Sequence, residues 1–200
     1  MSGLQILVLR SLFGRISLQN NLPAQTVAQR LFSADCPPKD CCPPPEPSPK
    51  DLANVKEAWC EIDRNKGCYA KAIFTEVFKK YPDYAQLFAK FGRCPTDILK
   101  NEKFSEHLKK NVMDEMGNVI KKMGEDMCEA KSMASDIGKK HVKLCVKPKH
   151  FENTEKIFID VLKKQMGEKL SCDGAKSLEN VIKSVFKQLK KGAAADSCSS

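Results

Sequence analysis

From Ser48 onward, apolar residues recur at intervals of three or four positions along the chain. This spacing places apolar side chains on one face of an α-helix, whereas a half-buried strand would need alternation with a period of two. No segment of strand length shows that alternation, and the sequence contains no internal repeat. The sequence therefore predicts an all-α domain.

Residues typical of helix ends divide this region. Ser48-Pro49-Lys50-Asp51 combines an N-cap serine, a first-turn proline and an acid near the positive end of the helix dipole. The further features that we expect are breaks at 65–67 and 81–82, a short turn to residue 91, a loop over 92–101, a long helix ending near Gly124, and boundaries at Pro148, Gly167, about Cys172 and Gly192.

Residues 1–34 differ in composition from the rest of the chain. They contain Arg10, Arg15 and Arg30 and no acidic residue, and Ser and Gln are mixed with apolar residues at helix-compatible spacing. This composition is typical of a mitochondrial presequence, and Arg30-Leu31-Phe32-Ser33 resembles the cleavage pattern of such peptides. We therefore expect residues 1–34 to be a targeting segment and the protein to be mitochondrial. A secreted or extracellular protein with a secretory signal, and a cytoplasmic protein, are the alternatives.

Residues 35–50 hold seven of the eleven prolines and three of the ten cysteines. Proline fixes φ and lacks an N–H donor, so we expect a flexible, extended arm here, followed by a helical domain over 51–192 and a disordered tail over 193–200. The arm's cysteines could link copies of the chain into disulfide-bonded or other oligomers. The other seven cysteines lack CxxC or zinc-ligand spacing, which leaves disulfides and buried small hydrophobic thiols as alternatives.

Composition excludes several classes of function. The formal net charge is +9, but the lysines are spread over all the helices among acidic residues and no nucleic-acid motif appears, so we expect no nucleic-acid partner. No stretch reaches the ~20 apolar residues that a transmembrane helix needs. We find no hydrolase triad, metal-hydrolase motif or P-loop, and therefore expect a protein that is not an enzyme.

Two of the three histidines occur in helical patterns. Met133, Ile137 and His141 fall at positions i, i+4 and i+8, which places the imidazole on an apolar helix face. His107 lies in an earlier helix, three residues after Phe104. A single inward-facing histidine is usually a core residue with satisfied nitrogens, so the residues around these two decide their interpretation.

Those residues resemble the globin family over nearly all of 48–192. The features that carry the resemblance are Trp59 in the first helix, the segment Tyr81-Pro82-Asp83-Tyr84-Ala85-Gln86-Leu87-Phe88, Phe91, the F-x-x-H pattern of Phe104 and His107, and His141 with Ile137 before it, Phe151 ten residues later and Gly167. The resemblance implies a three-over-three, globin-like helical sandwich around a haem pocket, with an N-terminal extension.

The resemblance also implies a site for haem b, iron protoporphyrin IX. His141 would be the proximal iron ligand, and its other ring nitrogen should donate to a carbonyl one turn earlier. His107 would be the distal residue, which either donates a hydrogen bond to a dioxygen ligand or itself binds the iron as a sixth ligand. The apolar walls would come from Phe88, Phe91, Val112, Ile137, Val146, Phe151 and Phe158.

The distal helix departs from the family pattern. A small apolar residue is expected four positions after the distal histidine, but the chain has Asn111 there and Val112 one position later. Either the helix register slips by one, which would place Leu108 over the iron and move His107 aside, or Asn111 is a second polar group in the distal pocket.

The resulting hypothesis is a haem protein that reversibly binds dioxygen or another diatomic gas, for oxygen transport or storage or for nitric oxide chemistry. Weak dioxygenase or peroxidase-type activity is the enzymatic alternative. Two further hypotheses are a redox sensor in which Cys145 and the cysteine-rich arm couple thiol state to the haem, and a haem-less globin-fold interaction module.

Overall fold

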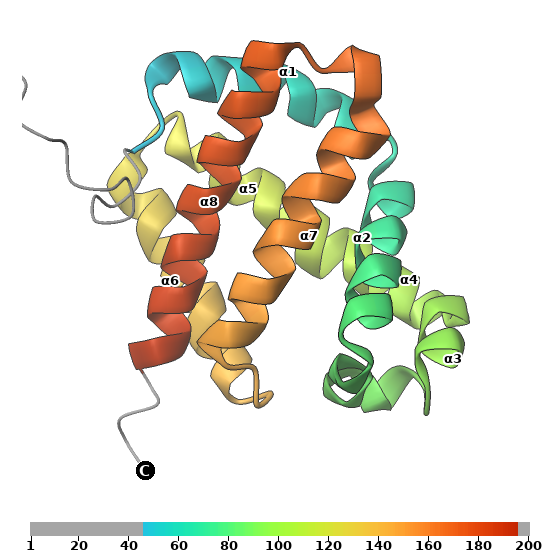
Figure 1. Ribbon diagram of the computed structural model, residues 1–200. Helices are drawn as coiled ribbons and strands as arrows, with labels where there is room; N and C mark the ends of the chain where they lie inside the picture. Colours follow the sequence, from blue (N-terminus) through green and yellow to red (C-terminus); the bar gives the residue numbers. More distant parts are fainter. Residues whose placement is uncertain (1–45, 196–200) are drawn as a thin grey trace, which may run out of the picture. The chain divides into compact units, whose positions relative to one another are not determined.

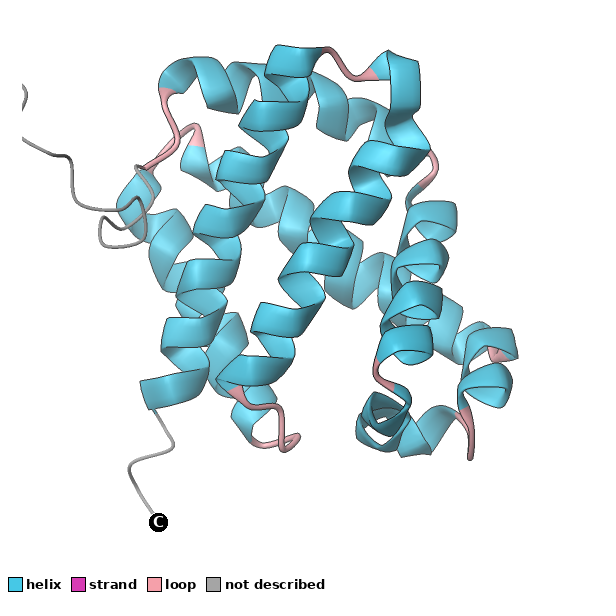
Figure 2. Ribbon diagram, viewed as in Figure 1, coloured by secondary structure: helices cyan, strands magenta, loops and turns pink. Residues whose placement is uncertain are grey.

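The computed structural model of the protein describes residues 46–195. The targeting segment at 1–34, residues 35–45 of the arm and residues 196–200 of the tail lie outside the described residues, so these predictions stay predictions. Every regular element between 46 and 195 is helical (Figure 2), which confirms the all-α prediction. None of these helices is both long and apolar enough to cross a bilayer.

Eight α-helices and three short 3₁₀ or π elements follow one another within residues 46–195. In chain order they are α1 (Pro49–Arg64), α2 (Lys66–Lys80), the 3₁₀ segment η1 (Pro82–Phe91), α3 (Pro95–Lys100), α4 (Glu102–Leu108), the π-helical segment η2 (Lys109–Asp114), α5 (Glu115–Met123), α6 (Met127–Val142), α7 (Pro148–Met166), the 3₁₀ turn η3 (Gly167–Lys169) and α8 (Cys172–Ala195).

The residues predicted to begin or end helices make the expected caps and turns. The Asp51 backbone N–H donates to Ser48 Oγ at 3.1 Å, and the Ser48 N–H donates to Asp51 Oδ2 at 3.0 Å, which forms a capping box. Pro148 occupies the first turn of α7. Gly167 follows the last residue of α7 with φ +49°, a backbone conformation that glycine adopts without steric cost.

Two segments differ from the expected pattern. The expected loop over 92–101 contains α3, which starts with Pro95, has Asp97 in its first turn and buries Ile98 completely. The last helix does not stop at Gly192 but continues to Ala195. Alanine has the highest helix propensity, so the three alanines after Gly192 favour this continuation.

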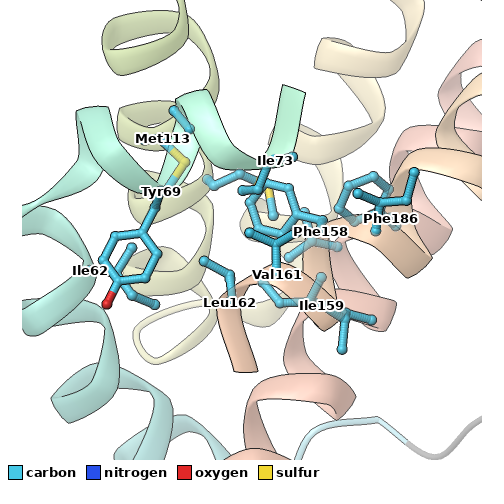
Figure 3. Close-up of a cluster of buried hydrophobic side chains, with 14 of the residues drawn as sticks. Ile62, Tyr69, Ile73, Met113, Phe158, Ile159, Val161, Leu162 and Phe186 are labelled. Carbon is cyan, nitrogen blue, oxygen red and sulfur yellow. The ribbon is translucent and has the colours of Figure 1, made fainter. Parts of the chain in front are cut away.

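The helices form two layers. In Figure 1, α2, α7 and α8 lie in front of α4, α5 and α6, and α8 packs against α6, α1 and α7. The core between the layers is one hydrophobic cluster, part of which is drawn in Figure 3. Its largest fully buried side chains include Phe104, Phe158, Ile62, Ile73, Leu108, Met113 and Leu162.

The cysteines of the described region are not core residues. The six that lie there, Cys60, Cys68, Cys94, Cys128, Cys145 and Cys172, are exposed and form no disulfide. The alternative of buried small hydrophobic thiols is therefore wrong for these six, and the structure shows no disulfide among them. A thiol can replace a polar side chain on a helix surface with little effect on packing, so helical periodicity does not constrain it.

Candidate functional site

A mostly apolar cavity is lined by residues of α2, η1, η2, α5, α6, α7 and α8 and of the connection before α7. Eight of the ten residues that the sequence predicts for the site line it: Phe88, Asn111, Val112, Ile137, His141, Val146, Phe151 and Phe158. The fold thus gathers residues from η1, η2, α6, α7 and the connection before α7 around one space. Their roles as cofactor contacts stay predictions.

His141 is the strongest potential ligand in this cavity. Its Nδ1 lies 2.8 Å from the backbone carbonyl oxygen of Ile137, one turn earlier in α6. Because a carbonyl oxygen can only accept, Nδ1 carries the hydrogen and donates, so the neutral ring has its lone pair on Nε2. This confirms the expected partner of the ring nitrogen. Phe151 packs edge-on against the imidazole with ring centroids 5.3 Å apart.

Two faces of helix α6 have different surroundings. Ala130, Ala134 and Gly138 are buried, and α6 packs closely against α8. The Met133, Ile137 and His141 stripe is only half-buried, and its last two residues line the cavity. The small residues therefore pack α6 against α8, while Ile137 and His141 face a space that protein atoms do not fill.

The distal helix is interrupted by the π-helical segment η2, Lys109–Asp114. A π turn closes its hydrogen bonds at i→i+5, so it holds one residue more than an α turn. Phe104 and His107 precede this segment, and Val112 lies within it, five residues after His107. The extra residue explains why the apolar residue at the cavity follows the histidine by five positions and not by four.

The π segment also changes which residues enter the core. Met113, 2% exposed, takes the buried position that a regular helix would give to Val112, and Val112 lines the cavity. Leu108 is likewise 2% exposed and lies in the core cluster, not among the cavity-lining residues. The slipped register would require Leu108 at the cavity, and the structure does not place it there.

His107 lies outside the set of lining residues, in a partly buried position beside the cavity. Its Nδ1 is 3.0 Å from Nδ2 of Asn111, which does line the cavity. Burial, the Lys90 ammonium and the His141 imidazole, in decreasing order, lower the pKa of His107.

Phe91 also lies outside the lining set. Its ring contacts Phe104 and His107, with centroids 5.2 Å and 5.4 Å away, and the Lys90 ammonium sits 4.8 Å from its centroid. Its backbone carbonyl accepts a hydrogen bond from Asn101 Nδ2 at 2.7 Å. Asn101 also caps α4, so this one side chain links the end of η1 to the helix that carries His107.

Several polar lining residues were not among the predicted site residues. They are Tyr84, Glu115, His150 and Thr154. Asn153 Nδ2 donates to the Tyr84 hydroxyl at 2.7 Å, and the His150 ring packs edge-on against the Tyr84 ring at 4.7 Å. His150 directly precedes the predicted Phe151, and this adjacency could have indicated that His150 lies near the cavity. Glu115 could be placed at the cavity only with knowledge of the π segment.

The environment of His150 predicts that the free energy of unfolding depends on pH. Its Nδ1 accepts the Lys147 N–H at 3.0 Å, and burial, followed by the Lys147 charge, lowers its pKa. The unfolded chain then binds the proton more readily, so the stabilisation is complete above the unfolded pKa of ~6.5 and is lost as pH falls below it. Between neutral and mildly acidic pH, urea unfolding should show a smaller loss of stability for His150→Phe than for the wild type. Equal losses would show that His150 does not contribute.

Comparison with known proteins is consistent with this geometry. The globin family profile matches residues 71–189. Myoglobin of Makaira nigricans is 27% identical over 143 residues, covering 70% of this chain and 92% of its own. Neuroglobin of Tetraodon nigroviridis is 23% identical over 147 residues, covering 72% and 91%.

Among solved structures, a hexacoordinated heme protein from an anhydrobiotic tardigrade shares the fold, with a TM-score of 0.66 and 17% identity over 74% of this chain and 95% of that one. The family profile alone spans more than half of the sequence. It covers the helices that supply His107, His141 and the apolar walls between them. The chain belongs to the globin family.

Proposed function

We propose that this globin holds haem b in the cavity through His141 and reversibly binds dioxygen or another diatomic gas. The observation that carries the proposal is the hydrogen bond from His141 Nδ1 to the Ile137 carbonyl. It leaves the Nε2 lone pair available at an apolar cavity, and a neutral imidazole oriented in this way is a strong axial donor. When bound, haem would supply the iron centre at which a gas ligand binds.

The walls of the cavity suit a flat apolar group. Phe88, Val112, Ile137 and Val146 pack against the core but remain only partly buried. Covering them would remove their remaining apolar surface from water, which is the main driving force for holding a large apolar cofactor. Globin membership, the similarity to myoglobin and neuroglobin, and the similarity to a heme protein support haem binding.

The residues at the distal side would control the ligand. The His107 imidazole lies beside the cavity, in contact with Asn111, which lines it. An N–H donor at this place would stabilise a ligand that carries partial negative charge, while the other walls of the cavity remain apolar. This arrangement favours gas binding over hydrolytic chemistry.

The proposal is tested by absorption spectra of the purified full chain mixed with hemin, in the ferric, dithionite-reduced and carbon monoxide states. We expect a sharp Soret band that shifts on addition of carbon monoxide. Split visible bands in the reduced form would add that a second axial ligand competes with the gas. The spectrum of free hemin in all three states would overturn the proposal and favour a haem-less interaction module.

A further inference from the structure

We propose that Asn111 is a positioning residue that selects the tautomer of His107, and thereby decides whether His107 donates a hydrogen bond or binds the iron. The inference rests on the proposed haem function and specifies how its distal side is regulated. It starts from the contact between Asn111 Nδ2 and His107 Nδ1, 3.0 Å apart, beside the cavity.

The contact has a definite chemical consequence. With the amide nitrogen facing the ring, Asn111 donates to Nδ1, so the neutral imidazole carries its hydrogen on Nε2. An Nε2–H group can donate to a gas ligand but has no lone pair for iron. In this arrangement His107 is a hydrogen-bond donor and the distal iron position stays open for gas.

Rotation of the amide reverses the outcome. If the Asn111 carbonyl oxygen faces the ring, it accepts from an Nδ1–H, and the Nε2 lone pair becomes available as a sixth ligand. Both arrangements keep the same hydrogen-bonded pair, because an amide offers a donor on one side and an acceptor on the other. Among the described residues, the aromatic rings of Phe91 and Phe104 also contact the ring, and an aromatic ring cannot fix a tautomer in this way.

The proximal histidine shows the contrast. The partner of His141 Nδ1 is the Ile137 backbone carbonyl, which only accepts, so that imidazole is locked with its Nε2 lone pair free. The partner of His107 Nδ1 is a side-chain amide, which can accept or donate. One histidine of the pair is therefore fixed in the tautomer that could bind iron, and the other has two tautomers whose balance Asn111 sets.

The π segment is what makes this contact part of the site. Asn111 is four residues after His107, so the two side chains meet along one helix face. In the family pattern this position is apolar. Here η2 includes one additional residue, so Val112 lines the cavity while Asn111 remains beside both the cavity and the histidine.

The test is Asn111→Asp, because a carboxylate only accepts. At alkaline pH, where the ring is neutral, ¹⁵N NMR of the haem-free full chain should show His107 mainly as the Nε2–H tautomer in the wild type and as the Nδ1–H tautomer in the variant. We expect a shift in the tautomer ratio of about tenfold or more, since hydrogen bonds to charged groups are stronger than neutral ones. With haem bound, the reduced variant should show split visible bands, and His107→Leu in the same background should remove them.

Asn118→Asp is the matched control. Asn118 is exposed on α5, borders a different groove beside α1, and would carry the same added charge. This variant should keep the wild-type tautomer and spectrum. Haem binding by Asn111→Asp with both the tautomer and the spectrum of the wild type would overturn the inference while the proposed function stands. Failure of every form to bind hemin would instead overturn the proposed function, and the haem-free NMR would still decide whether Asn111 sets the tautomer.

Discussion

Replacement of His141 by alanine is expected to abolish stable haem retention and to leave the helical domain folded. His141 provides the Nε2 lone pair at the cavity, and its position at the end of α6 is only half-buried, so truncation leaves no large core void. Loss of an outer hydrogen bond to a metal ligand typically lowers affinity about 10–100-fold, and loss of the ligand itself should lower it further. Hemin titration followed at the Soret band measures the affinity, and circular dichroism confirms the fold.

His150→Ala is the control for this experiment. His150 lines the same cavity, but its Nδ1 accepts the Lys147 N–H and its ring packs against Tyr84. This variant should retain hemin with the wild-type axial spectrum. A His141→Gly variant should regain a five- or six-coordinate spectrum when free imidazole is added, because the small ligand can occupy the vacated space. Retained hemin with an unchanged spectrum in His141→Ala would rule out the assignment.

The helix pattern and the proximal side could be predicted because their determinants are local. The Ser48 capping box, Pro148 and Gly167 act within a few residues of each helix end. The bond from His141 to the Ile137 carbonyl needs only one turn of α-helix, so a histidine at that position determines it directly. Spacing along a regular helix is sufficient information for such features.

The distal side could be predicted only in part, because it depends on a small local departure from the α-helix. Periodicity measures an average spacing, and a single additional residue in η2 can be mistaken for a shifted register. The conflict between the Phe104–His107 spacing and the later apolar stripe was a real signal of irregularity. Its resolution, with Val112 at the cavity and Met113 in the core, required the tertiary structure.

Polar cavity residues were missed for a different reason. Glu115, His150 and Thr154 line the cavity from α5 and α7, and each has a polar or charged residue directly before it in the sequence. Whether such a residue faces solvent or a cavity depends on how the helices are rotated against each other. The rotation of α6, in turn, depends on two glycines whose importance the sequence alone did not indicate.

Gly138 and Gly192 allow the backbones of α6 and α8 to touch. A Cβ atom added at Gly138 would overlap the Leu189 carbonyl oxygen and lie 3.0 Å from the Ala193 nitrogen. A Cβ atom added at Gly192 would overlap the Ser135 carbonyl oxygen. Main-chain atoms cannot rotate away as a side chain can, so either substitution must push the two helices apart.

Gly138→Ala and Gly192→Ala are therefore each expected to destabilise the domain, although alanine is the better helix former by about 1 kcal/mol. Overpacking typically costs about 1–3 kcal/mol, and it should exceed the propensity gain where backbone must move. For a domain of this size each kcal/mol lowers the melting temperature by roughly 2–4 °C. Gly124→Ala is the control, because its Cβ would meet only the Lys121 carbonyl oxygen at 3.4 Å, an ordinary contact.

Haem retention adds a second measurement to this comparison. His141 lies one turn after Gly138 on the same helix, so separation of α6 from α8 displaces the proximal imidazole relative to the cavity. Gly138→Ala should therefore release hemin faster than Gly124→Ala at a temperature where both remain folded. Wild-type melting and wild-type hemin release in Gly138→Ala would show that the α6–α8 contact does not position His141. Faster hemin release at unchanged helicity would show that the contact between the α6 and α8 backbones holds His141 in place.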